Sequence, residues 1–149
     1  MSEKILTMKL LKEKYGVVRL DKTDLIPEWA KNSEFYSITK TEDELSIVCS
    51  QNRIPGDVKC ESDWRILKVE GTLDFSLIGI VSSISTVLAQ KKISIFAIST
   101  YDTDYILVKD KDIENAINSL SNEKGSTSTF VKQPNNCKNI LQNNTIISR

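Results

Sequence analysis

The chain has 149 residues, which is the length of one ordinary domain or of two very small ones. Its 20 lysines and arginines balance its 20 aspartates and glutamates, so no net charge attracts it to nucleic acid or to an anionic membrane surface. Histidine is absent, which excludes Ser-His-Asp and Cys-His catalysis and the zinc sites that contain histidine.

The N-terminal segment has the pattern of a half-buried strand. Leu6, Met8 and Leu10 alternate with polar residues, which predicts a strand over residues 5–10. A turn around Gly16 precedes another apolar segment, so we expect a hairpin whose second strand covers residues 17–20.

One helical turn and two more strands are predicted in the rest of the first fifty residues. Pro27 suits the first position of a helix, which predicts a single turn over residues 27–30. Residues 35–39 and 45–50 are expected to be strands joined by the acidic turn 41–44.

A module boundary is predicted between residues 51 and 63. The apolar periodicity disappears there, and Pro55-Gly56-Asp57 is a turn signal. We therefore expect an irregular, strand-rich first module over 1–60 and a regular second module over 61–132.

The second module has the element order β-α-β-β-α-β. The expected strands and helices lie at 65–70 (strand), 77–90 (helix), 93–99 and 105–109 (strands), 112–124 (helix) and 127–132 (strand). Asp74 and Ser76 are suitable caps for the first helix. This order predicts a ferredoxin-like α+β fold, in which both helices cover one face of a four-stranded antiparallel sheet.

The polar tail, residues 133–149, has five asparagines and no acidic residue. Such a composition predicts disorder, although its four apolar side chains could also form a short docked segment.

Cysteine usage and the N-terminus indicate a cytoplasmic protein. Cys49, Cys60 and Cys137 are odd in number and form no Cys-x-x-Cys pair, so three reduced thiols are expected. The N-terminus lacks a signal-peptide layout, and no apolar run approaches the ~20 residues of a membrane span.

Neither a cofactor nor a metal is expected. The five glycines are too dispersed for a phosphate-binding loop or a dinucleotide fingerprint. Four aspartates crowd into residues 102–112, but the glycine and the terminal glutamate of a calcium loop are missing.

Two loops of the second module could bind a free amino acid. The loop 71–79 ends in a glycine near a helix N-terminus, where unpaired N–H groups favour a carboxylate. The loop 99–104 offers aspartates and hydroxyls for an ammonium group. We expect the second strand to run antiparallel to the first, so that the two loops would meet only across a neighbouring module. The same residues could alternatively serve only as helix caps and turn formers.

Three stretches resemble the ACT-domain proteins of the CASTOR type. They are EWAKNSEFYSITKTEDELS (28–46), ELSIVCSQNRIP (44–55) and WRILKVEGTLDFSLIGIVSSISTVLAQKKISIFAISTYDTDYILVK (64–109). The resemblance covers about residues 5–132. It implies two ferredoxin-like ACT modules side by side, with antiparallel sheets and helices on one face, the first irregular and the second a regular ACT module.

The resemblance also implies a ligand site. In the arginine-sensing relatives, the ligand is held between modules by the glycine-bearing loop before the first helix and by an aspartate near the hairpin. The corresponding residues here are Gly71, Asp74, Phe75, Ser76, Gly79, Ser99, Thr100, Thr103 and Asp104. Those sensors have four modules and this chain has two, so a comparable site implies a homodimer.

We therefore expect a non-enzymatic regulatory or sensor protein that binds a free amino acid through module–module interfaces. A regulated protein is a possible partner, and nucleic acid and membranes are not expected partners. The alternative is an ACT-type dimerisation or interaction protein that binds no ligand. An enzyme is the weakest option, because no histidine and no paired-carboxylate arrangement supports one.

Overall fold

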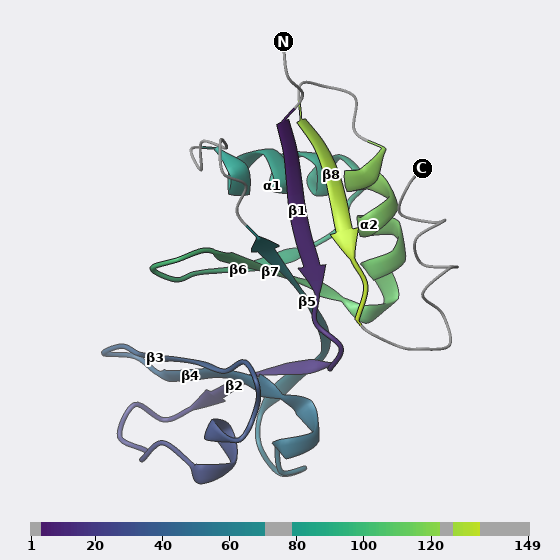
Figure 1. Cartoon of the computed structure of the whole chain (residues 1–149). Helices are drawn as coiled ribbons and strands as arrows, with labels where there is room; N and C mark the ends of the chain where they lie inside the picture. Colours follow the sequence, from purple (N-terminus) through teal and green to yellow (C-terminus); the bar gives the residue numbers. More distant parts are fainter. Residues whose placement is uncertain (1–3, 71–78, 123–126, 135–149) are drawn as a thin grey trace. The chain divides into compact units, whose positions relative to one another are not determined.

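The computed structural model describes residues 4–70, 79–122 and 127–134, and the chain divides into two units (Figure 1). Unit 1 comprises residues 1–12 and 65–149, and unit 2 comprises residues 13–64. The N-terminal strand thus belongs with the second half of the chain, whereas the sequence pattern groups it with the first half.

Unit 1 contains a sheet in the order β8–β1–β5–β7–β6. These strands are β1 (Lys4–Leu10), β5 (Cys60–Glu70), β6 (Ile95–Ser99), β7 (Asp104–Lys109) and β8 (Thr127–Lys132). Without β1, this is the strand order of the ferredoxin-like fold, as predicted for the second module. The predicted four-stranded antiparallel sheet is wrong in one respect, because β1 lies between β5 and β8 and is parallel to β8.

The predicted hairpin between residues 5–10 and 17–20 is also wrong, because β1 pairs with β5 and β8. The apolar face of β1 explains why this strand lies between β5 and β8. Leu6, Met8 and Leu10 are buried in the core of unit 1, where Met8 lies between Val69 and Val131. Strand β1 therefore takes part in the core as well as in the backbone hydrogen bonds.

Two helices cover one face of this sheet, α1 (Ile80–Gln90) and α2 (Ile113–Ser121); in Figure 1, α1 passes behind β1 and β8, and α2 runs beside β8. The predicted apolar face of α2 is confirmed, since all four of its members are buried: Ile113, Ala116, Ile117 and Leu120. Helix α1 begins at Ile80, three residues later than predicted, and its predicted caps Asp74 and Ser76 lie outside the described residues. None of the helices in the described ranges could cross a membrane.

Unit 2 repeats the ferredoxin-like topology with very short helices. Its elements are β2 (Tyr15–Leu20), the 3₁₀ turn η1 (Glu28–Lys31), β3 (Ser37–Lys40), β4 (Leu45–Ser50), η2 (Gln51–Arg53) and the start of β5. The strand order is β3–β4–β2–β5, and all of these pairs are antiparallel. Each helix of the fold is thus replaced by about one turn.

Strand β5 belongs to both units. Its first residues pair with β2 in unit 2, and its last residues pair with β1 in unit 1. The predicted strand start at residue 65 is therefore five residues late. A strand signal is missing at residues 60–64 because this part of the strand has no alternating pattern. Glu61, Ser62 and Asp63 are all exposed, and Asp63 has a φ of 66°.

The core of unit 2 contains a buried thiol. Cys49 is 0% exposed and packs with Val18, Ala30, Leu45 and Ile47. Burial, with a smaller contribution from the neighbouring Cys60 thiol, raises the pKa of Cys49 from 9.0 to about 11. The thiolate is therefore disfavoured in the folded protein.

This thiol should make the protein less stable in alkali. Between pH 9 and pH 11 the unfolded chain loses the Cys49 proton while the folded chain keeps it, so the free energy of unfolding falls as pH rises. We expect a loss of about 1–2 kcal/mol over this range. Urea denaturation at a series of pH values measures it. In Cys49→Ala the fall should be smaller by this amount, whereas an equal fall in both proteins would contradict the assignment.

Candidate ligand site

The hairpin between β6 and β7 carries four of the predicted site residues. Ser99 and Asp104 form the last residue pair of the two strands, and the Ser99 hydroxyl donates a hydrogen bond to Oδ1 of Asp104 at 2.5 Å. The Thr100 N–H donates to the Thr103 carbonyl at 2.8 Å, and the Thr100 hydroxyl donates to the same oxygen at 3.0 Å. The backbone and side chains of this turn are therefore held in a defined arrangement.

The Asp104 carboxylate lies on the sheet face that the helices cover. Successive side chains of a strand alternate between faces, and Ile106 and Val108 are buried with α1 and α2 in the core. Asp104 is two and four residues before them in the same strand, so its side chain points to the same face. Ser99 shares that face as the cross-strand partner of Asp104. Asp104 is half-buried and Ser99 is exposed, so a polar pair lies where the apolar core ends.

The hairpin also lies beside the end of β5. The Thr103 hydroxyl donates to the carbonyl of Val69, one residue before β5 ends at Glu70. Our expectation that the second strand of this module runs antiparallel to the first is therefore wrong, because the β6–β7 turn lies at the end of β5. In a β-α-β crossover the two strands are parallel, so the C-terminal ends of β5 and β6 lie at the same edge of the sheet.

Helix α1 begins after a glycine. Gly79 occupies its N-cap with a φ of +83°, a conformation that favours glycine, and its carbonyl accepts a hydrogen bond from the Ser83 N–H at 2.8 Å. No described side chain caps the N–H groups of the first turn, which carry the positive end of the helix dipole. A crossover helix runs back along the sheet, so this N-terminus belongs to the edge where β5 ends.

Five of the nine predicted site residues are thus placed by the structure. The hairpin brings together Ser99, Thr100, Thr103 and Asp104, and Gly79 begins α1. The other four lie outside the described residues: Gly71, Asp74, Phe75 and Ser76.

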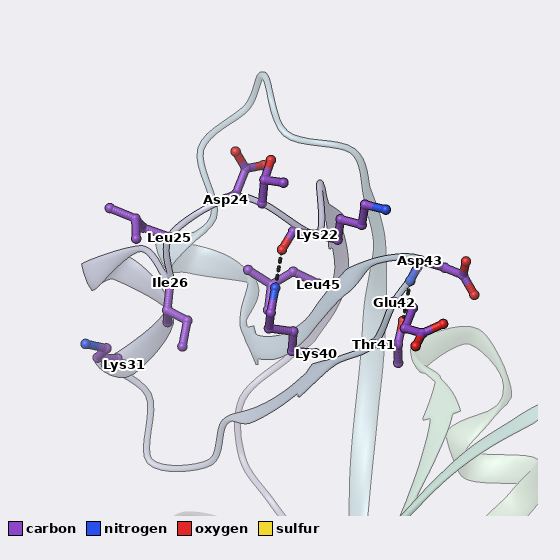
Figure 2. A pocket seen from close by; sticks show the side chains of 11 residues that line it. Lys22, Asp24, Leu25, Ile26, Lys31, Lys40, Thr41, Glu42, Asp43 and Leu45 are labelled. Carbon is purple, nitrogen blue, oxygen red and sulfur yellow. Dashed lines mark hydrogen bonds between the residues drawn. The ribbon is translucent and has the colours of Figure 1, made fainter.

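Unit 2 has an open groove that the sequence analysis did not predict (Figure 2). It is lined by residues 22–26, by Lys31, and by 40–43 with Leu45, and its volume is about 1530 Å³. A repeated pattern could have indicated it, because Thr41-Glu42-Asp43 matches the Thr-x-Asp sequence of the unit 1 hairpin, 100–102.

Both parts of the chain match known protein families. Residues 59–122 match the ACT domain family, and residues 13–57 match a family described as an N-terminal domain. Protein Atu0741 from Agrobacterium tumefaciens is 38% identical, and its crystal structure superposes with a TM-score of 0.78 over 88% of this chain and 96% of that protein.

Two further proteins are more distant. The human protein CASTOR3P is 30% identical over 103 residues, which are 60% of this chain and 63% of CASTOR3P, so the chain spans less than two thirds of that curated relative. Aspartate kinase from Clostridium acetobutylicum is 13% identical with a TM-score of 0.56, over 75% of this chain and 33% of the kinase, which shows a shared fold.

The ferredoxin-like topology of unit 1 and the match over residues 59–122 define an ACT module. The predicted resemblance to ACT-domain proteins of the CASTOR type is thus confirmed by the match of residues 59–122 and by the similarity to CASTOR3P.

Proposed function

We propose that this chain is a non-enzymatic regulatory protein that binds a free amino acid at the edge of unit 1 where β5 ends. One observation supports the proposal most directly: the Asp104 carboxylate lies on the helix-covered face of a hairpin that Thr103 joins to the end of β5. This is the same edge to which the N-terminus of α1 belongs.

The charges at this edge suit a zwitterion. The N–H groups of the first turn of α1 attract a carboxylate, because they carry the positive end of the helix dipole. Asp104 and the hydroxyls of Ser99 and Thr100 accept hydrogen bonds from an ammonium group. An α-amino acid has both groups on one carbon, so it can bind both sides of the site at once.

A homodimer is part of the proposal. Among the described strands, β6 pairs only with β7, so its outer edge has backbone groups available for a second copy. A partner there would lie next to Ser99, where β6 ends. Ligand binding and dimerisation would then strengthen each other reciprocally.

Similarity to an allosteric kinase supports a regulatory role. The clostridial aspartate kinase is an allosteric enzyme, and this chain corresponds to 33% of its length. We infer that the chain acts on a separate protein, whose activity depends on the bound amino acid.

Thermal melting with each of the twenty amino acids tests the proposal. A ligand at 100 times its dissociation constant should add about 2.7 kcal/mol to the free energy of unfolding, so one or a few amino acids should raise Tm. Mass spectrometry of small molecules retained by the purified protein should identify the same compounds. Twenty unchanged melting curves and no retained amino acid would contradict the proposal.

Such a result would favour the second function, an ACT-type dimerisation module without a ligand. The observation behind this alternative is that the Ser99 hydroxyl already donates to Asp104, as it would in a hairpin that only forms a turn. Analytical ultracentrifugation separates the two functions, because only the ligand-binding protein should dimerise more strongly when an amino acid is added.

A further inference from the structure

The groove of unit 2 occupies the same topological position as the proposed amino-acid site of unit 1. In both units a connection links the first strand of the ferredoxin-like fold to the first helix or turn, and a hairpin joins the second and third strands. In unit 2 this connection is the loop 21–27 and the hairpin is 41–44, and the groove lies between them (Figure 2). The two sites are therefore topological counterparts.

The two hairpins are also built in the same way. The Thr41 N–H donates to the Glu44 carbonyl at 2.9 Å, as the Thr100 N–H donates to the Thr103 carbonyl at 2.8 Å. The closing pair is Lys40 and Leu45 in unit 2, in the place of Ser99 and Asp104 in unit 1.

These closing residues lie on equivalent faces. Leu45 is 1% exposed and packs with Ala30 of η1, so its face is the one that η1 covers. Lys40 shares this face as the cross-strand partner of Leu45. The counterpart of the Asp104 carboxylate is thus an apolar side chain, and the counterpart of the Ser99 hydroxyl is an ammonium group.

The ammonium group of Lys40 is fixed in the groove. It donates a hydrogen bond to the Lys22 carbonyl, which joins the hairpin to the loop (Figure 2). The loop also presents Leu25, 89% exposed, and Ile26, 43% exposed, to the same groove. The groove therefore combines a cation with apolar side chains that no described part of the chain covers.

A second cation of the groove, Lys31, lies near this apolar surface. Lys31 lies beside Ile26, and Glu42 and Asp43 lie at the opposite end of the groove from Leu25 (Figure 2). The remaining carboxylate, Asp24, accepts a hydrogen bond from the Asp21 N–H at 2.9 Å.

We propose that this groove is a second ligand site, which binds a small monocarboxylate that has a branched apolar chain and no ammonium group, such as a 2-oxo acid. The carboxylate lies against Lys40, and the apolar chain lies against Leu25 and Ile26. An amino acid is disfavoured, because Leu45 stands where unit 1 has the acceptor for an ammonium group. The site is separate from the one proposed in unit 1.

NMR titration of the full chain with α-ketoisocaproate tests the site. We expect amide signals of residues 22–26 and 40–45 to shift, with saturation at millimolar concentrations. Signals of the hairpin 99–104 should stay in place. Leucine, which has the same side chain with an ammonium group, should shift the groove signals at least tenfold less at equal concentration, and so should the uncharged amide of α-ketoisocaproate.

Two variants test the groups involved. Lys40→Gln should weaken binding about tenfold, because a charge-assisted hydrogen bond is lost. Leu25→Ala should also weaken it, and this exposed residue can be changed without affecting the fold. Lys59→Gln, a matched change at an exposed lysine of the same unit outside the groove, should bind like the wild type.

The inference is overturned if α-ketoisocaproate leaves the groove signals unchanged, if leucine binds there equally well, or if Lys40→Gln and Leu25→Ala both bind like the wild type. NMR distinguishes the two proposals, since an amino acid bound in unit 1 should shift the signals of residues 99–104 and α-ketoisocaproate should shift those of the groove. The two proposals can therefore fail independently.

Discussion

Replacing Asp104 by alanine should abolish the stabilisation that a bound amino acid gives. Of the two residues that close the β6–β7 hairpin, Ser99 and Asp104, only Asp104 has a carboxylate. Its removal therefore leaves the ammonium group of the ligand without a charged partner. At 100 times the wild-type dissociation constant, the gain of about 2.7 kcal/mol should fall to nearly zero. Thermal melting and isothermal titration calorimetry with the amino acid found in the screen measure this loss.

Asp102→Ala is the matched control. Asp102 lies in the same hairpin but is exposed at its tip, two residues from Asp104, so its removal should leave ligand binding unchanged. Without ligand, the free energy of unfolding of Asp104→Ala should lie within about 1 kcal/mol of the wild-type value, because the variant loses mainly the hydrogen bond from Ser99. Equal ligand-induced stabilisation in Asp104→Ala and the wild type would contradict a role of Asp104 in ligand binding.

Replacing Met8 by alanine should cause a large loss of stability. Met8 is 0% exposed and lies between Val69 of β5 and Val131 of β8, so truncation leaves a cavity in the core of unit 1. Large-to-small changes of this kind cost about 2–5 kcal/mol. Urea denaturation followed by circular dichroism measures the change in the free energy of unfolding.

The neighbouring residue provides the control for this prediction. Lys9 is exposed on the other face of the same strand, so Lys9→Ala should change stability by less than about 0.5 kcal/mol. If β1 instead formed the hairpin with residues 17–20, Met8 would not lie between β5 and β8. A loss below about 1 kcal/mol in Met8→Ala would contradict its position in the sheet of unit 1.

Local patterns predicted most elements of the second module. The helical spacing of Ile113, Ala116, Ile117 and Leu120 predicted α2 and its buried face, because a helix with one apolar face repeats every 3.6 residues. The hairpin 99–104 was also predicted, since two apolar segments flank a short polar turn. Such signals depend only on neighbours in the sequence.

The short helices of the first module gave no periodic signal, although Pro27 predicted the single turn that η1 forms. The turns η1 and η2 have four and three residues, too few for a 3.6-residue period to appear. The ferredoxin-like topology of unit 2 became visible only through its strand order. The groove was missed for the same reason, since its loop and hairpin become neighbours only when the strands are paired.

The sequence by itself determined the apolar faces, the ferredoxin-like pattern of the second module, the relation to ACT-domain proteins and the hairpin that holds Asp104. Only the tertiary structure decided that β1 lies between β5 and β8, and that the hairpin contacts the end of β5 through Thr103. The reason is physical: alternation shows which side of a strand is buried, but the choice of neighbouring strand depends on contacts between residues far apart in the chain.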